Sequence, residues 1–385
     1  MKPSKEMIKV IPRELVPVTD IDVRELAEIY EETESYLSIY LPTASKEEIS
    51  INETYLSSRI RAVEKVIEGE SASEFEDALE LVEAHIKHAP IPGEKGRIIF
   101  ASSSVGLLHV YRISVEPERT FVLDTSPFLL PLAKLRDDYV DYALLLMDSQ
   151  QAKLFMIRSN IMEMEDSDSM DLMNRHKKGG MSQMRFNRLR RGAINAFVSE
   201  IIEDLEELEE LKDSRGVVIA GPGEAKKNLL ESLPQYLREQ VIGIEDTSID
   251  ISMGDLLEIG ERFAEKDERD KEKVLVDQLR SSIMKGEPAA YGVPRVKTAL
   301  INGRVSVLLL LDDTSIPGWI CERCQSITER STPPEKCPNC GGPTSEVDVV
   351  EELYELAERT GAGTEFVKES PFLESLGGIG AILRY

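Results

Sequence analysis

All four cysteines of this 385-residue chain lie in one cluster, Cys321-x2-Cys324-x12-Cys337-x2-Cys340. Each C-x-x-C pair can direct two thiolates at one tetrahedral ion, and the intervening loop can fold back to join the pairs. No cysteine remains for a disulfide elsewhere, which is typical of a reducing compartment. The spacing predicts a closed structural zinc site. Reduced thiols without a metal and an iron–sulfur cluster are the alternatives.

A basic segment with a glycine pair interrupts an otherwise acidic chain. The formal net charge of −25 argues against general nucleic-acid binding. Between Arg175 and Arg191, however, there are seven Lys or Arg residues and no Asp or Glu. Gly179 and Gly180 have no Cβ and can adopt positive φ, so the backbone there can approach a ligand closely. This pattern predicts a segment that is inserted into RNA, and a solvated surface loop is the alternative.

Outside these features, predicted strands alternate with predicted helices, as in sheets flanked by helices. We predict an α/β fold with three α/β domains, 1–137, 138–268 and 269–385, and a zinc-ribbon excursion at 318–343 in the third. The predicted strands are 7–11, 36–41, 97–102, 107–115, 120–123, 139–147, 152–158, 215–220, 241–244, 305–311 and 364–367. The predicted longer helices are 22–32, 46–69, 72–87, 183–211, 273–285 and 346–361.

Three segments carry more specific expectations. Met162–Met173 is polar and irregular, so no element is predicted there. The charged run Asp267–Lys273 is interpreted as a linker or a helix start. The helix at 183–211 is expected to pack an apolar stripe against a core. That stripe is Phe197, Ile201, Leu205, Leu208 and Leu211.

The sequence predicts a cytoplasmic protein with no membrane partner. No run approaches the roughly 20 apolar residues that span a bilayer. Residues 1–10 lack the apolar core and the cleavage site of a signal peptide.

The basic segment resembles a known motif. Gly179-Gly180-Met181-Ser182-Gln183-Met184-Arg185-Phe186-Asn187-Arg188-Leu189-Arg190 is similar to Gly-Gly-Gln-Ser-x-x-Arg-Phe-x-Arg-Leu, the central motif of class I release factors of archaea and eukaryotes. The ending, 372–385, also resembles that family, and the resemblance is specific over 139–385 and weaker over 1–138. In the family, the first domain reads stop codons, the second releases the nascent chain at the peptidyl-transferase centre, and the third binds a translational GTPase. The resemblance implies a tRNA-like arrangement of the three domains.

The resemblance also implies which residues of the loop act. The catalytic candidates are Gly179, Gly180, Met181, Ser182 and Gln183. Phosphate binding is independent of base sequence and favours cationic side chains, Arg above all. The candidates for contacts with rRNA or peptidyl-tRNA are Arg175, His176, Lys177, Lys178, Arg185, Arg188, Arg190 and Arg191.

Two departures from the family pattern bear on activity. Met181 stands where the family has its catalytic Gln, whose backbone N–H helps stabilise the reacting ester and whose side chain helps select water. A backbone donor survives this substitution, whereas a Met side chain cannot position water, and Gln183 would replace it only after a two-residue shift. The codon-reading Asn-Ile-Lys-Ser falls at Tyr55–Ser58, without the Asn and the Lys, and the second codon-site motif is missing near Phe128–Lys134.

These observations lead to two main hypotheses. The first is a ribosomal A-site factor that promotes peptidyl-tRNA hydrolysis in termination or rescue without reading a stop codon, with an elongation-factor-like GTPase as the partner that the resemblance implies. The second is a non-hydrolytic binder that protects or holds idle or stalled ribosomes. The wider family includes Pelota-type, Vms-type and Balon-type factors, which enter the A site without a stop codon. A metal-dependent nuclease using Asp166, Asp168 and Asp171 is a third class. Gly221-Pro-Gly223 is either a structural turn or an anion site.

Overall fold

The computed structural model describes residues 14–29, 36–67, 69–104, 106–169, 195–321, 323–324, 326–329 and 332–385. The chain divides into two compact units, one formed by Met1–Asp138 with Lys271–Tyr385 and the other by Tyr139–Asp270. Each described strand that the sequence predicted is present, with ends displaced by at most three residues, whereas the predicted strand at 7–11 lies outside the described residues. Within the described ranges, no helix combines the length and apolar character needed to cross a membrane.

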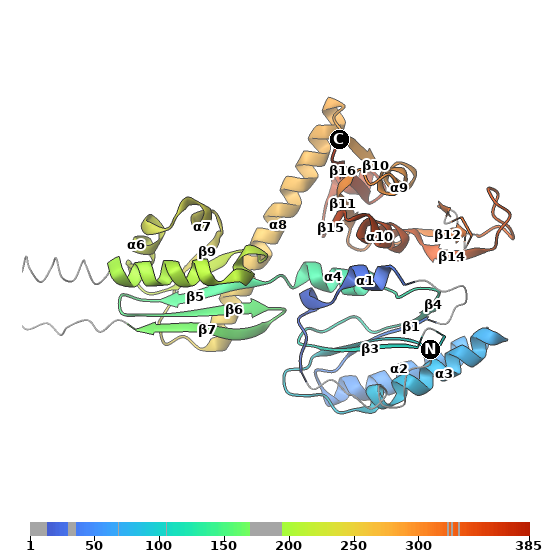
Figure 1. The fold of residues 1–385 in the computed structure, drawn as a ribbon, viewed down its shortest axis with the longest axis horizontal. Helices are drawn as coiled ribbons and strands as arrows, with labels where there is room; N and C mark the ends of the chain where they lie inside the picture. Colours follow the sequence, from blue (N-terminus) through green and yellow to red (C-terminus); the bar gives the residue numbers. More distant parts are fainter. Residues whose placement is uncertain are drawn as a thin grey trace, which may run out of the picture. The chain divides into compact units, whose positions relative to one another are not determined.

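The unit Tyr139–Asp270 is a sheet with helices on both faces (Figure 1). The strand order is β7-β6-β5-β8-β9, with β5, β8 and β9 parallel and β6 and β7 antiparallel. The elements are β5 (Tyr142–Met147), β6 (Gln151–Arg158), β7 (Ile161–Ser169), a helix at 195–207, a 3-10 helix (Glu209–Lys212), β8 (Val217–Gly221), α6 (Ala225–Ser232), α7 (Gln235–Glu239), β9 (Val241–Asp246) and the start of α8 (Met253–Lys285).

Alternation along the strands explains the two helical layers. Side chains of successive strand residues point to opposite faces of a sheet. Ala143 and Leu145 pack on the face covered by the 195–207 helix, α6 and α7. Leu144 and Leu146 pack on the face covered by α8. A strand that is apolar at every position is therefore buried on both sides.

The N-terminal part of the other unit is an antiparallel sheet of order β3-β2-β1-β4, with α2 and α3 on one face. Ser45 caps α2 by accepting a hydrogen bond from the Glu48 backbone N–H at 3.1 Å. The elements are a 3-10 helix (Val18–Asp20), α1 (Val23–Ala27), β1 (Tyr36–Pro42), α2 (Lys46–Val63), α3 (Glu70–Lys87), β2 (Gly96–Ser102), β3 (Leu107–Ile113), β4 (Thr120–Asp124) and α4 (Leu130–Asp138).

The C-terminal part contains a sheet of order β10-β16-β11-β15 and a second, small sheet of order β13-β12-β14. Leu279 of α8 and Leu373 of α11 pack on one face of the larger sheet. The elements are β10 (Ala289–Tyr291), α9 (Val293–Ile301), β11 (Val305–Leu311), β12 (Pro317–Cys321), β13 (Ile327–Thr328), β14 (Thr344–Asp348), α10 (Val349–Thr360), β15 (Gly363–Val367), α11 (Pro371–Ser375) and β16 (Ile379–Leu383).

Several expectations about chain segments were wrong. Residues 161–169, expected to begin an irregular segment, form the edge strand β7, which pairs with β6 despite its acidic composition. An edge strand needs only one paired side, so ladder hydrogen bonds form there without an apolar pattern. The 195–207 helix ends before Leu211, because Leu208 has non-helical dihedrals (φ −70°, ψ 93°).

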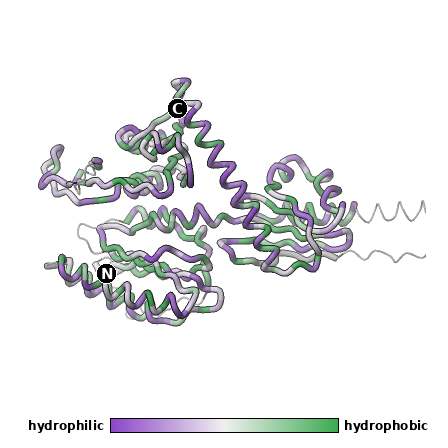
Figure 2. Tube along the Cα trace, turned by 180° about the vertical axis from the view of Figure 1, so that it is seen from behind, coloured by the Kyte–Doolittle hydropathy of each residue, from purple (hydrophilic) through white to green (hydrophobic). Residues whose placement is uncertain are grey.

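The charged run Asp267–Lys273 is not a linker but lies inside the 33-residue helix α8. Figure 2 shows that hydrophilic residues dominate α8 along most of its length. Within the run, the exposed Arg269 pairs with Glu265 one helical turn earlier, at 3.0 Å, whereas Glu268 and Glu272 are buried. The helix expected to begin at Glu346 begins at Val349, after β14, with Asp348 as its N-cap.

Candidate functional site

The predicted residues of the glycine loop lie outside the described residues. This holds for the catalytic candidates Gly179, Gly180, Met181, Ser182 and Gln183, and for the RNA-binding candidates Arg175, His176, Lys177, Lys178, Arg185, Arg188, Arg190 and Arg191. Asp171 lies outside as well, and Asp166 and Asp168 occupy positions on β7.

The described elements next to this loop are firmly anchored. On the preceding side, β7 ends at Ser169 and is held by β6. On the following side, the 195–207 helix and the turn after it bury the predicted apolar stripe. The exposed fractions are 3% for Phe197, 1% for Ile201, 1% for Leu205, 7% for Leu208 and 1% for Leu211. The expectation of a core-packed helix is confirmed, and a loop that leaves from such elements has fixed ends.

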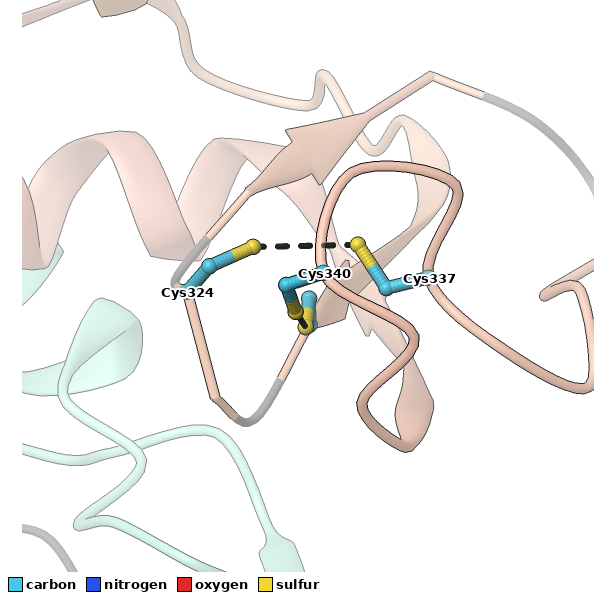
Figure 3. A group of neighbouring side chains, drawn as sticks. Cys324, Cys337 and Cys340 are labelled. Carbon is cyan, nitrogen blue, oxygen red and sulfur yellow. Dashed lines mark hydrogen bonds between the residues drawn. The ribbon is translucent and has the colours of Figure 1, made fainter.

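The four cysteines converge on one point in the small sheet of the C-terminal part. Figure 3 shows the side chains of Cys324, Cys337 and Cys340 pointing toward one another. The four Sγ atoms all lie within 4.8 Å of one another, with 3.4 Å between Cys321 and Cys340 and 3.7 Å between Cys324 and Cys337. A tetrahedral ion with metal–sulfur bonds of about 2.3 Å requires sulfur separations of roughly 3.8 Å. The four thiols therefore have the spacing of a metal centre.

Glycine and backbone groups shape this cysteine centre. A Cβ on Gly342 would lie 2.8 Å from the Cβ of Arg323 and 3.3 Å from Cys340 Sγ, so the close approach of the chain to Arg323 beside the sulfurs favours glycine. Gly341 has φ +72°, the left-handed conformation that the second knuckle needs. The Asn339 N–H donates to Cys337 Sγ at 3.4 Å, which favours the thiolate. The groups around the four cysteines therefore also suit a bound metal ion.

The pKa values of two of the thiols, Cys321 and Cys324, differ from their usual range. Desolvation opposes ionisation at Cys321, but hydrogen bonds to its sulfur, first from the backbone of Cys324, lower its pKa to about 6. Desolvation, together with the sulfur of Cys321, raises the pKa of Cys324 to about 12. The Cys324 thiol thus retains its proton at neutral pH, and a bound cation would displace that proton.

Trp319 and Lys297 attach the cysteine centre to the rest of the C-terminal part. Trp319 is 2% exposed and packs with Cys321 and Cys337 in a small core of its own. Lys297 of α9 donates a hydrogen bond from Nζ to the Ile327 carbonyl on β13 at 2.9 Å. No sequence pattern predicts this contact, because residues 30 positions apart meet only through the fold.

The position of the absent codon-reading motif is a helix surface. Tyr55–Ser58 lies in α2, where Leu56 is buried in the core and Ser57 and Ser58 line a hollow of about 630 Å³ with Arg61 and Lys65. The Ser57 hydroxyl donates to the Glu53 carbonyl one turn earlier at 2.8 Å. Arg59 lies over the Tyr55 ring at 5.3 Å. These side chains are largely engaged within their own helix.

The turn at Gly221–Gly223 is closed by its own lysine. The buried Lys226 donates to the carbonyls of Gly221 and Gly223 and pairs with Asp246 at 2.7 Å. Because Asp246 already neutralises the charge of Lys226, this lysine attracts an anionic ligand only weakly. The contacts favour the structural interpretation of this turn.

The chain is similar in sequence to known proteins. Residues 141–266 match the family described as eRF1 domain 2, and residues 270–385 match the family described as eRF1 domain 3. Peptide chain release factor subunit 1 of Archaeoglobus fulgidus is 29% identical over 336 residues, covering 80% of this chain and 82% of that protein. The same factor of Thermoplasma acidophilum is 26% identical over 394 residues, covering 94% of each chain.

Among solved structures, the archaeal translation termination factor aRF1 covers 94% of this chain at 18% identity, with a TM-score of 0.27. The two family matches together span more than half of the chain and leave a gap of only a few residues between them. This chain therefore belongs to the class I peptide chain release factor family.

Proposed function

We propose that this protein is a ribosomal A-site factor that promotes peptidyl-tRNA hydrolysis in termination or rescue without reading a stop codon. The observation that carries the proposal is the Gly179-Gly180 segment with its basic stem, located within the match to release factor domain 2. Anchored elements on both sides of the segment support its use as a projecting loop.

The proposed chemistry depends on the backbone. Gly179 and Gly180 shape the loop, and the Met181 N–H donates to the oxygen that becomes negative as water attacks the ester. Such a donor acts through its fixed position and does not depend on its own side chain. The water is then positioned by the ribosome or the tRNA, because a thioether cannot hold it as an amide does. Ser182 and Gln183 complete the loop.

Cationic residues on both sides of Gly179 and Gly180 would bind this segment to RNA. Arg185, Arg188, Arg190 and Arg191 follow the glycines, and Arg175, His176, Lys177 and Lys178 precede them. Each phosphate contact releases counterions, so ribosome binding should weaken as salt rises. The acidic remainder of the chain disfavours binding to RNA elsewhere.

The absence of codon reading rests on the N-terminal part. The α2 surface at Tyr55–Ser58 lacks the Asn and Lys of the family motif. The Ser57 hydroxyl donates to the Glu53 carbonyl of its own helix. Lys134, in the second missing motif, pairs with Asp312 at 2.8 Å. At these two positions the donor groups of Ser57 and Lys134 are therefore already engaged within the protein.

The remaining proposals concern cofactor, domains and partners. Cys321, Cys324, Cys337 and Cys340 would hold one Zn²⁺ as a closed structural ion without a catalytic position. The three functional domains would be 1–137, 138–268 and 269–385, with the zinc ribbon at 318–343. The partners would be the ribosome with its rRNA and peptidyl-tRNA, and an elongation-factor-like GTPase at the third domain, all in the cytoplasm.

The second candidate function is non-hydrolytic. Met181 favours it, because the side chain that selects water in the family is replaced by one that cannot hydrogen-bond strongly. In this case the protein would occupy the A site of an idle or stalled ribosome and protect or hold it.

A peptidyl-tRNA release assay on programmed ribosomes separates the two functions. If the protein is a hydrolase, the wild type releases peptide with a stop or a sense codon in the A site, and Gly180→Ala reduces release to background. Met184→Gln, in the same segment, is the matched control for Met181→Gln. No turnover by the wild type, together with activity gained by Met181→Gln alone, would establish the non-hydrolytic binder. Failure to co-sediment with ribosomes at moderate salt would contradict both.

A further inference from the structure

Helix α10 presents two carboxyl groups to the segment that leads out of the N-terminal sheet. Glu351 and Glu355 are one turn apart on α10, and Glu355 is 5% exposed. The Leu129 backbone N–H donates to Glu351 Oε1 at 3.2 Å. The Ser126 hydroxyl donates to Glu355 Oε1 at 3.1 Å. Both contacts join the N-terminal part, 14–138, to the C-terminal part, 271–385, within one compact unit.

Like charges gather around these two carboxyl groups. We call Asp124, Ser126, Leu129, Glu351 and Glu355 the acidic seam. Burial, then the charges of its neighbours, first Glu355 and then Asp124, raise the pKa of Glu351 well above its usual range.

Other titratable groups modify the acidic seam. At Glu355, burial raises the pKa to about 7, and the opposing attraction of Arg359, whose guanidinium lies 3.1 Å away, is the weaker effect. Glu352 adds a further acidic neighbour at Glu351. Burial, then the charges of Glu351 and Tyr354, raise the pKa of the Tyr40 hydroxyl.

The neighbouring helix α4 contacts the C-terminal part through two ion pairs. Lys134 pairs with Asp312 at 2.8 Å, and Asp138 pairs with Lys368 at 2.8 Å. Between these pairs, burial and the charge of Glu365 raise the pKa of Asp137 to about 7. Figure 1 shows α4 beside β15 and α1 beside α10. Helix α4, which directly precedes the Tyr139–Asp270 unit in the chain, therefore also joins the N-terminal part to the C-terminal part.

We propose that the acidic seam is a proton-linked clamp between the N-terminal and C-terminal parts. The clamp closes with Glu351 and Glu355 protonated, and it opens when they ionise and take up water. The two parts then move as one body in the closed state and separately in the open state. This inference is independent of any activity on ribosomes.

The direction of the pH effect follows from linkage. In the closed state these carboxyls bind protons that they release when exposed, so closing takes up protons and acid favours the clamp. A carboxyl shifted from its usual value to about 7 changes the ratio of closed to open molecules about tenfold between pH 6 and pH 8. Glu351 acts in the same direction. Below pH 4 both states are protonated and the effect ends.

Amide hydrogen exchange on the full-length chain tests the clamp without ribosomes. Peptides covering 124–138 and 349–360 are followed from pH 6 to pH 8, with rates divided by the intrinsic rate at each pH. We expect protection in these peptides to fall about tenfold or more with rising pH, while the β1 peptide 36–42 keeps constant protection. Protection that is independent of pH in the seam peptides of the wild type would overturn the proposal.

Two variants separate proton binding from simple contact. Glu355→Gln keeps the shape and the acceptor oxygen but cannot ionise, so the clamp should stay closed at pH 8 and lose most of its pH dependence. Glu374→Gln changes an exposed carboxyl on α11, outside the seam, and should behave like the wild type. If Glu355→Gln retains the wild-type pH dependence, or loses protection at both ends of the range, the clamp is not proton-linked. The β1 peptide reports whether either variant remains folded.

Discussion

Removal of metal from the cysteine centre should unfold the zinc ribbon and expose the single tryptophan of the chain. Trp319 is 2% exposed in a small core shared with Cys321 and Cys337. The sequence contains one Trp, so tryptophan emission reports on this module alone. Two perturbations are used. A chelator removes the ion, and Cys337→Ser removes one of its ligands.

The expected size of the effect comes from comparing two contributions. Burying a Trp side chain of roughly 200 Å² stabilises by about 5 kcal/mol at about 25 cal/mol per Å². A structural zinc ion in small modules contributes about 10–16 kcal/mol at neutral pH. The ion thus stabilises the module more than the buried Trp does, and among the described residues of the small core Trp319 is the one large side chain. Burial of Trp319 alone should therefore not hold the ribbon together.

The assay follows tryptophan emission during titration with a chelator and measures metal content by mass spectrometry. We expect one zinc per chain in the purified protein, and a shift of the emission to longer wavelength as zinc is lost. Zinc, added back under reducing conditions, should restore the emission. Exchange protection of β1 should stay constant, because the N-terminal sheet has its own core.

Two results would refute this reasoning. Complete metal loss with unchanged emission would mean that the ribbon folds on its apolar contacts alone. Iron and sulfide, found in place of zinc, would establish the iron–sulfur alternative.

Two further substitutions test the packing that holds the sheets. Glu94→Gln should destabilise the N-terminal sheet by about 3–5 kcal/mol in denaturant unfolding, because it leaves the buried guanidiniums of Arg97 and Arg112 without their shared counter-charge. Gly221→Ala should destabilise the Tyr139–Asp270 unit by about 3 kcal/mol or more, since its Cβ would lie 1.8 Å from the Met147 carbonyl oxygen at a φ of +142°.

Matched controls exist for both substitutions. Glu83→Gln removes the partner of Lys87 on an exposed face of α3 and should leave the free energy of unfolding nearly unchanged. Gly223→Ala introduces a side chain at φ +69° with no atom within 4 Å, so about 1 kcal/mol of backbone strain is expected without a clash. Equal losses in Glu83→Gln and Glu94→Gln, or in the two glycine variants, would contradict the packing argument.

Local patterns determined most of the elements. The apolar run in β5 predicted a doubly buried strand, and both faces of that strand are covered. The stripe from Phe197 to Leu211 predicted a packed helix. The cysteine spacing predicted the ligand set, since thiolates two residues apart can reach one ion only through a tight turn. These features depend on neighbours within a few residues, so they can be recognised in the sequence.

Other features depended on partners that are distant in sequence. The acidic strand β7 forms because β6 offers a free edge, and α8 continues through a charged run because apolar residues on either side pack on cores. Glu351 and Glu355 look like ordinary solvent-facing acids of an amphipathic helix in the sequence. Only the fold brings Ser126 and Leu129 against them and removes water. Desolvation and, to a smaller extent, the charge of Asp124 raise the pKa of Glu355 to about 7, and tertiary structure decides both.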